Sequence, residues 1–202
     1  MIAVFLAMFI WAVIHSALAG QRAKGYIRRR FGERVYYGLY RIGYNSLAGL
    51  TLVPILLWIY LRPSNVVWMV SPSLTPFLLI IQAVGLIGLV ISLIQIDLGR
   101  FLGLSQLSAF LKAQPLPLPE EPLQVGGLYG LVRHPLYLFS MLVLWPVSTM
   151  TDAILAFNIL ASLYFVFGSL LEEQRLVAAF GQPYVEYQQR IPWLIPFVHW
   201  PR

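Results

Sequence analysis

The feature that constrains this chain most is a series of apolar runs of about the length of a membrane-crossing helix. Five can be read, at residues 1–19, 42–61, 74–96, 136–150 and 153–171. A helix needs about 20 apolar residues to cross the hydrocarbon core of a bilayer. Only 11% of the 202 residues are charged, against about 25% in a soluble domain. The runs predict an all-α, polytopic transmembrane helix bundle of about five spans.

The fourth run, 136–150, is short for a span, and only Thr151 and Asp152 separate it from the fifth. We therefore expect these two runs to form a tight helical hairpin, with the fourth tilted or not fully crossing. One integral membrane domain over 1–202 is expected, in which 1–96 supplies three N-terminal spans.

The first connecting loop is strongly basic. Seven of the fourteen Lys and Arg residues lie in it: Arg22, Lys24, Arg28, Arg29, Arg30, Arg34 and Arg41. Loops rich in Lys and Arg stay in the cytoplasm, so we expect a bacterial inner-membrane protein with its N-terminus outside and its C-terminus cytosolic. The net charge of +6 then indicates contact with anionic membrane lipids, and no nucleic-acid partner is expected.

The first run ends in Ala17-Leu18-Ala19-Gly20, which imitates a signal-peptidase site. A signal peptide also has a basic segment before its apolar region, and none precedes this run. We expect it to be a retained span.

Two cytosolic segments differ from the apolar runs. Residues 97–135 are rich in Pro and Gly, which predicts an irregular loop. The tail after 171 has apolar and aromatic positions near helical spacing, broken at Gly181-Gln182-Pro183, so two short interfacial helices are expected there.

Residue types limit the chemistry. The chain has no cysteine, which excludes a disulfide, a thiolate metal site and a cysteine nucleophile. The three histidines, His15, His134 and His199, lie far apart without metal-ligand spacing. No metal site is expected.

Polar residues stand at the start of the fourth run, in Arg133-His134-Pro135. Proline favours the first position of a helix and disfavours helical backbone in the residue before it. His134 is therefore expected to stand off a helix N-terminus, where free N–H groups and the helix dipole favour an anion. Arg133 could add a bidentate contact; alternatively it only reaches toward the interface, and His134 is a polar cap.

Glu172 and Glu173 follow the fifth run and are expected to end its helix beside Arg133 and His134. Carboxylates are unfavourable at a helix C-terminus, which indicates a bound cation; alternatively Glu172 pairs with Arg175, three residues on.

Tyrosines bracket this region: Tyr129, Tyr137, Tyr184 and Tyr187. Tyrosine is enriched at membrane interfaces, but its ring face also attracts a cation. S-adenosylmethionine carries a carboxylate, an ammonium, a sulfonium and an adenine ring, and would satisfy all these features.

Two ordered motifs carry a family resemblance. The first is G-x-Y-x-x-V-R-H-P-x-Y, at 127–137, and the second is E-E followed by F-G-x-x-Y-x-x-Y, at 172–173 and 180–187. Together they resemble the isoprenylcysteine carboxyl methyltransferase and phospholipid methyltransferase superfamily. The fuller wording, RHPLYL, LEEQRLVAAFG and YQQRIPWLIP, is more similar to methanethiol S-methyltransferases and NnrU-type membrane proteins. Those thiol enzymes are expected to carry a D-x-F-G-L-x-Q element, whereas 97–106 reads DLGRFLGLSQ, with extra residues.

The resemblance implies a membrane-embedded methyltransferase that takes S-adenosylmethionine from the cytosol and a small thiol or lipophilic acceptor from the bilayer. Residues 97–202 would form the cofactor-binding catalytic half. The implied cofactor-binding residues are Tyr129, Arg133, His134, Tyr137, Glu172, Glu173, Tyr184 and Tyr187. The candidate catalytic residues are Glu172, Glu173 and His134, with a glutamate preferred as the base.

The acceptor stays open among a small thiol, an isoprenylcysteine carboxylate and a lipid amine. A non-enzymatic membrane accessory or transport protein on the same scaffold is the alternative from another class.

Overall fold

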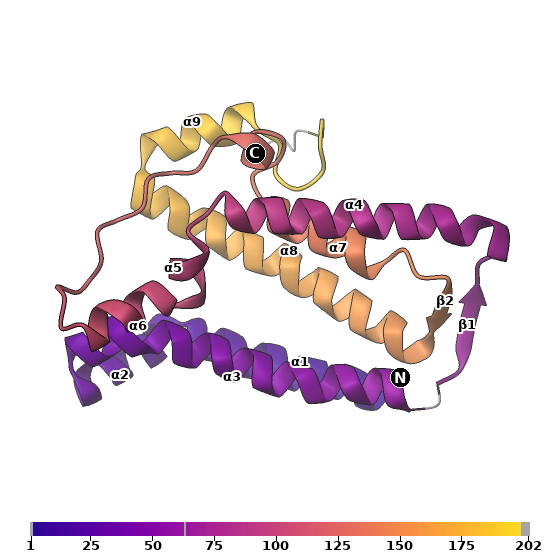
Figure 1. Cartoon of the computed structure of the whole chain (residues 1–202), viewed down its shortest axis with the longest axis horizontal. Helices are drawn as coiled ribbons and strands as arrows, with labels where there is room; N and C mark the ends of the chain where they lie inside the picture. Colours follow the sequence, from indigo (N-terminus) through magenta and orange to yellow (C-terminus); the bar gives the residue numbers. More distant parts are fainter. Residues whose placement is uncertain (1, 63, 199–202) are drawn as a thin grey trace. The chain divides into compact units, whose positions relative to one another are not determined.

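Helices make up most of the structure, a computed structural model that describes residues 2–62 and 64–198 (Figure 1); His199 lies outside them. The helices are α1 (Ile2–Ala19), α2 (Gln21–Phe31), α3 (Glu33–Leu61), α4 (Thr75–Ile94), α5 (Leu98–Leu102), α6 (Leu104–Leu111), α7 (Pro135–Leu144), α8 (Asp152–Phe180) and α9 (Gln182–Arg190). The strands are β1 (Val66–Met69) and β2 (Thr149–Thr151), and short 3-10 turns cover Pro72–Leu74 and Gly127–Gly130. The predicted all-α membrane class is confirmed.

Four of the described helices are long and apolar enough to cross a membrane: α1, α3, α4 with the turn before it, and α8. The fourth predicted run, 136–150, forms α7, which has 10 residues and at 1.5 Å per residue is about half of the roughly 30 Å hydrocarbon thickness. As a helix this run is therefore too short to cross, and how its remaining residues sit in the membrane stays a prediction.

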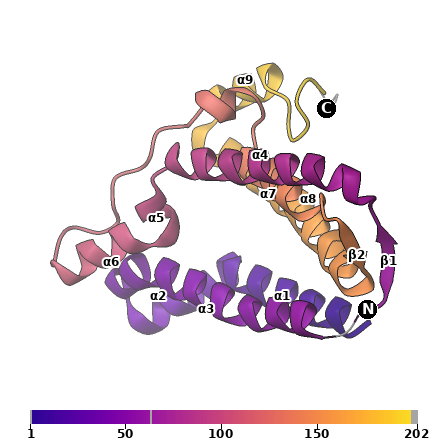
Figure 2. The ribbon, with the colours of Figure 1, turned by 45° about the vertical axis from the view of Figure 1, so that its right-hand side comes forward.

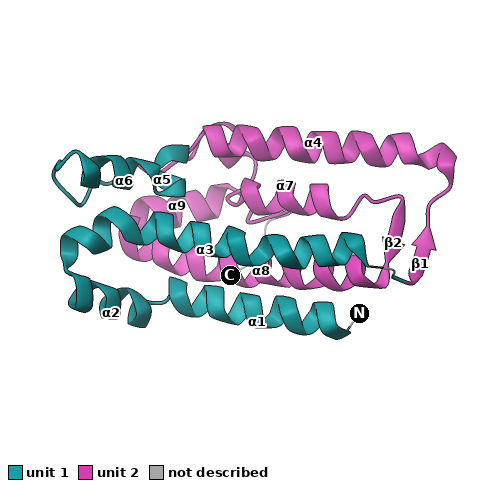
Figure 3. Ribbon diagram, turned by 60° about the horizontal axis from the view of Figure 1, so that its bottom comes forward, with its two compact units in different colours: residues 1–64, 97–121 teal, residues 65–96, 122–202 magenta. Residues whose placement is uncertain are grey.

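The chain divides into two compact units, coloured separately in Figure 3. The first contains residues 1–64 and 97–121, and the second contains 65–96 and 122–202. The single membrane domain expected from the sequence stays a prediction.

In the first unit, α3 packs against α1 and α6. The Trp11 indole of α1 donates to the Thr51 hydroxyl at 3.0 Å, and His15 Nε2 lies 2.6 Å from the Tyr44 hydroxyl. At the other contact, Gly38 of α3 lies against the Phe110 ring, where an added Cβ would be 2.6 Å from the ring. Helix α3 is thus fixed on two sides by its own polar and small residues.

In the second unit, α4 and α7 approach closely through small residues. Gly85, Gly88 and Ser92 are the buried positions of α4, and they recur along one side of the helix. A Cβ at Gly85 would lie 2.9 Å from the Leu142 carbonyl carbon, and one at Gly88 would lie 2.3 Å from the Phe139 ring. Small residues let membrane helices pack backbone to backbone where the hydrophobic effect offers little drive for association.

The C-terminal end of α7 is capped by side chains from its neighbours. Gln82 of α4 donates to the Val143 carbonyl at 3.0 Å, and Asn158 of α8 donates to the Leu144 carbonyl at 2.8 Å. A helix leaves its last four carbonyls without internal partners, and such groups are costly in an apolar medium. These two amides therefore allow α7 to stop short inside an apolar unit.

Beyond α7 the chain is extended rather than a simple turn. Strand β2 pairs with β1 in antiparallel fashion, with Trp68 opposite Met150, and this ribbon lies at the end of the second unit away from α9 (Figures 1 and 2). No strand was predicted from the sequence. The hairpin prediction holds in its main point, because α7 and α8 lie antiparallel side by side.

Helix α8 is longer than its apolar run. It continues to Phe180, so Glu172 and Glu173 lie inside the helix, and the prediction that they end it was wrong. The first of the two short helices expected in the tail is the last part of α8, while the second is α9. Both carboxylates lie more than one turn before the end of α8, where the helix dipole no longer disfavours them.

Replacing Gly88 by Ala should destabilise the protein. The new methyl must displace the Phe139 ring, and overpacking of this kind costs about 1–3 kcal/mol. Gly49→Ala in α3 is the matched control, because nothing lies within 4 Å of its Cβ position and Ala is favoured over Gly in a helix by about 1 kcal/mol. Thermal unfolding in detergent checks both, and equal melting temperatures for the two variants would contradict the close contact.

Candidate functional site

The N-terminus of α7 is set by its proline. Pro135 is the first helical residue, and His134 precedes it with φ −125° and ψ 62°, outside the helical region, as predicted. This non-helical backbone forms hydrogen bonds with the chain after α9. The Arg133 N–H donates to the Pro192 carbonyl at 2.9 Å, and the His134 N–H donates to the Trp193 carbonyl at 3.2 Å. The start of α7 is thereby fixed to the C-terminal segment.

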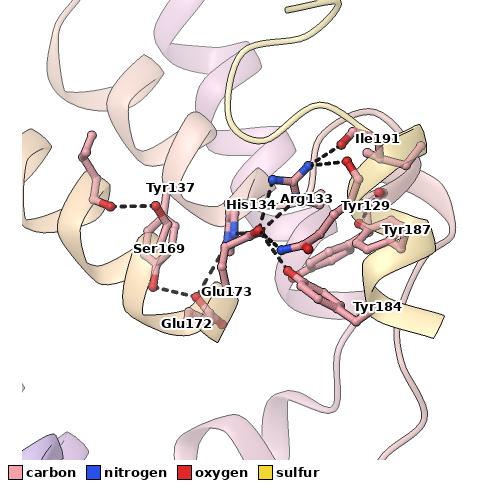
Figure 4. A network of polar contacts seen from close by, with 12 residues as sticks. Tyr129, Arg133, His134, Tyr137, Ser169, Glu172, Glu173, Tyr184, Tyr187 and Ile191 are labelled. Carbon is pink, nitrogen blue, oxygen red and sulfur yellow. Dashed lines mark hydrogen bonds and ion pairs between the residues drawn. The ribbon is translucent and has the colours of Figure 1, made fainter. Parts of the chain in front are cut away.

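Glu173 of α8 is the centre of a buried polar cluster (Figure 4). Its side chain is 2% exposed. Arg133 donates to it through two nitrogens, Nε at 2.9 Å and Nη2 at 3.0 Å. His134 Nε2 lies 2.7 Å from Oε1, the Tyr184 hydroxyl donates at 2.8 Å, and the Gln188 amide also donates. This carboxylate is thus surrounded by donors from α9 and from the residues preceding α7.

Arg133 is as fully engaged as Glu173. Its Nη1 donates to the carbonyls of Gln188 at 3.0 Å and Ile191 at 2.6 Å, in addition to the two bonds with Glu173. Four of the five guanidinium N–H groups therefore serve to hold α8, α9 and the chain after α9 together.

Glu172, the neighbouring carboxylate, has a different environment. Its side chain is 46% exposed. One oxygen accepts a hydrogen bond from the Tyr137 hydroxyl at 3.0 Å and lies 3.6 Å from His134 Nδ1. The Tyr137 ring is stacked between His134 and Phe165, with centroid separations of 5.7 Å and 5.5 Å. Glu172 is thus held in place on one side and open on the other.

His134 lies between the two carboxylates. An ionised carboxylate has no proton to donate, so Nε2 carries the proton toward Glu173, and Nδ1 faces Glu172. Burial disfavours the charged imidazole, but the contacts with Glu172 and Glu173 outweigh it and raise the pKa of His134 above its ordinary value. His134 and Arg133 together then balance the charges of the two glutamates.

The remaining tyrosines are buried around this cluster. The Tyr187 hydroxyl donates to the Tyr129 carbonyl, and Tyr184 donates to Glu173. Burial and the nearby Glu172 charge raise the pKa of Tyr129 to about 12. Burial likewise raises the pKa of Tyr184, where the Glu173 charge adds to it, and of Tyr187. All three phenols are neutral hydrogen-bonding groups at physiological pH.

All eight residues predicted for the site come together in one cluster, and Figure 4 labels each of them. The predicted meeting of Arg133 and His134 with the two glutamates is confirmed by the ion pairs. Their roles toward a cofactor stay predictions. Within the described residues, no group of three His, Asp or Glu side chains could hold a metal ion.

Sequence reasoning missed several participants. Gln188 stands one helical turn after Tyr184 on α9, and this spacing could have identified it. Gln95, at the end of α4, accepts a hydrogen bond from the Leu128 N–H at 3.0 Å. It lies so close to Gly127 (φ +59°) that a Cβ there would meet its amide at 1.5 Å. Trp193 has a buried indole N–H without an acceptor, and nothing in the sequence pointed to it.

The fold and the cluster together define a polytopic membrane protein with a buried charged network at one end of its second unit. The chain belongs to the NnrU family: the family model described as NnrU protein matches residues 3–143. This match includes the Arg133-His134-Pro135 motif and ends before Glu172. The resemblance found in the sequence is thereby confirmed.

Relatives with assigned names match most of the chain. Methanethiol S-methyltransferase 1 of Bradyrhizobium diazoefficiens is 32% identical over 195 residues, which cover 95% of this chain and 65% of that protein. Methanethiol S-methyltransferase of Mycobacterium tuberculosis is 30% identical over 191 residues, covering 94% of this chain and 75% of that protein. The chain therefore spans just under two thirds of the length of the Bradyrhizobium relative.

A third relative is similar over a shorter stretch. Protein-S-isoprenylcysteine O-methyltransferase B of Arabidopsis thaliana is 36% identical over 78 residues, covering 36% of this chain and 39% of that protein. No solved structure matches the chain.

The His134 environment predicts a pH dependence of stability. Because the pKa of His134 is raised on folding, its contribution is fully present below about pH 6.5, the ordinary histidine value, and is lost as the pH rises through the folded value. Melting temperatures in detergent should therefore fall between pH 6 and pH 9, and His134→Gln should flatten this decline. His15→Gln is the control and should keep it. An undiminished decline in His134→Gln would contradict the assignment.

Proposed function

We propose that this chain is an S-adenosylmethionine-dependent integral membrane methyltransferase that methylates a small thiol or a lipophilic acceptor. The observation that carries the proposal is the convergence of Tyr129, Arg133, His134, Glu172 and Glu173 in one cluster built by the motifs that resemble the methyltransferase superfamily. Several relatives named methanethiol S-methyltransferase match nearly the whole chain, both motifs included, and support the same conclusion.

The residues present fit the proposed cofactor. Glu172 is a half-exposed carboxylate that can accept the cofactor's ammonium, and the buried Trp193 indole N–H is a donor that still lacks an acceptor. The first N–H groups of α7 favour an anion such as the cofactor's carboxylate. The stacked His134 and Tyr137 rings offer faces for a cation or an adenine.

The two glutamates have different proposed roles. Glu173 is buried and already accepts hydrogen bonds from four side chains, so its role is to position His134, Arg133 and α9. Glu172 is open on one side, and we assign to it the contact with the cofactor. Glu172 is also better placed than Glu173 to take the proton from the methyl acceptor, acting as a general base. His134 lies beside it and can hold the Glu172 carboxyl group in position.

The bound cofactor would supply an electrophilic methyl group on a sulfonium. The contribution of the protein is to align the acceptor with that methyl and to replace water by fixed dipoles, since an anionic nucleophile and a cationic donor are more strongly solvated than the transition state between them. The neutral tyrosines and the saturated Arg133–Glu173 pair provide fixed dipoles of this kind.

A small thiol is the acceptor we favour, because the relatives that match nearly the whole chain carry methanethiol S-methyltransferase in their names. An isoprenylcysteine carboxylate or a lipid amine is the next candidate. We further propose that the protein lies in a bacterial inner membrane as a single membrane domain, with its N-terminus outside and its C-terminus and the cluster facing the cytosol, where S-adenosylmethionine is made.

Glu172→Gln and Glu173→Gln should separate binding from stability. Glu172→Gln should lower the melting temperature only slightly, through the loss of its half-exposed contact with His134, but bind S-adenosylhomocysteine about tenfold more weakly, the effect of losing one charge-assisted contact. Glu173→Gln should itself unfold at lower temperature, because an unpaired buried Arg133 costs about 3–5 kcal/mol. Calorimetric titration and thermal unfolding check both.

Glu186→Gln removes an exposed carboxylate of α9 and is the matched control; it should change neither quantity. Wild-type affinity in Glu172→Gln would remove Glu172 from the proposed cofactor site.

The activity itself is tested by methyl transfer. Purified protein given methyl-labelled S-adenosylmethionine and methanethiol should release labelled dimethyl sulfide, and Glu172→Gln should lose most of this activity. Isoprenylcysteine and membrane extracts serve as the other acceptors. Folded protein that neither binds S-adenosylhomocysteine nor labels any acceptor would favour the non-enzymatic accessory or transport protein.

A further inference from the structure

The charge of this protein is concentrated in one short segment. Residues 21–41 contain seven basic residues and one acidic residue, Glu33, whereas the rest of the chain contains seven of each. The whole net charge of +6 therefore lies in α2 and the first part of α3. Residues 1–20 and 42–61, on either side, contain no charged residue at all.

The depth of α2 in the membrane is fixed by its connections. Only Gly20 separates it from α1 and only Gly32 separates it from α3, and both neighbours are long and apolar enough to cross a membrane. A single residue spans at most about 3.6 Å, so α2 cannot move away from the ends of these two helices. It therefore lies at the level of the lipid headgroups, at one end of the α1 and α3 pair (Figure 3).

The side chains of α2 suit that level. Arg22, Arg29 and Arg30 are exposed, as are the aromatic rings of Tyr26 and Phe31, at 60% and 55%. Basic residues combined with exposed aromatic ones are typical of helices that lie in the interface of an anionic membrane.

Other basic residues of the segment are held by internal contacts. Arg28 pairs with Glu33 and lies over the Tyr37 ring at 5.6 Å. Arg34 donates to the carbonyls of Phe110 and Gln114. Since Glu33 is the segment's one carboxylate and pairs with Arg28, no carboxylate of the segment remains for Arg22, Arg29 and Arg30. Of these three, Arg30 also lies over the Phe31 ring at 5.5 Å.

We infer that the exposed face of α2, defined by Arg22, Arg29 and Arg30, is a docking surface for the phosphates of anionic phospholipids in the adjoining leaflet. The fixed depth of α2 favours lipid over nucleic acid, because phosphodiesters of the bilayer lie at the height of these guanidinium groups. Each basic residue near an anionic surface strengthens attachment by roughly fivefold. The inference is independent of the methyltransferase proposal.

Native mass spectrometry of the full-length protein in detergent, titrated with phosphatidylglycerol or phosphatidylcholine, tests this. The wild type should bind phosphatidylglycerol at least about tenfold more tightly, and added salt should reduce the preference. The preference for phosphatidylglycerol should be abolished in the triple variant Arg22→Gln/Arg29→Gln/Arg30→Gln. It should persist in a control variant that loses the same charge elsewhere, Arg62→Gln/Arg175→Gln/Arg190→Gln.

Two results would overturn the inference. One is equal binding of the two lipids by the wild type, and the other is a preference that the control triple variant loses as completely as the α2 variant. The salt dependence of the wild type decides the question even where a triple variant does not fold.

Discussion

The carboxylate of Glu173 determines how the polar end of the second unit is assembled. It is shielded from water and receives hydrogen bonds from Arg133, His134, Tyr184 and Gln188. A buried carboxylate is stable only when it is paired and hydrogen-bonded, so these partners are required by the charge and not merely compatible with it. Through them one residue of α8 fixes the start of α7, the orientation of α9 and the imidazole beside Glu172.

The short α7 makes this arrangement possible. A helix that crossed the membrane fully would end where water can hydrogen-bond its last carbonyls. Helix α7 instead stops after 10 residues, and the Gln82 and Asn158 side chains donate to its last carbonyls. Close contact with Gly85 and Gly88 holds it against α4. The packing at one end of α7 thereby supports the precise placement of His134 at the other.

Much of the site could be predicted because polar residues stand out in an apolar sequence. Because proline starts a helix and disfavours helical backbone before it, His134 was correctly predicted to precede the helix. The predicted antiparallel hairpin correctly placed Glu172 and Glu173 beside His134. The end of α8 was predicted too early because an apolar run shows which part of a helix lies in the membrane, not where the helix ends. Residues 172–180 read EEQRLVAAF, which are nearly all good helix formers.

Other contacts could not be predicted. The carbonyls of Ile191, Pro192 and Trp193 accept hydrogen bonds, but every residue has a carbonyl, and only the folded structure shows which ones are used. The β1–β2 ribbon escaped notice because each strand is shorter than a recognisable alternating pattern.

The claim on which the rest depends is that this cluster is where S-adenosylmethionine binds. Hydrogen–deuterium exchange of the detergent-solubilised protein, with and without saturating S-adenosylhomocysteine, tests it most directly. Binding at the cluster should slow exchange in peptides covering 127–137 and 182–194, with no change in the β1–β2 ribbon or in α2. Protection confined to other peptides, in a protein shown to bind the ligand, would contradict it.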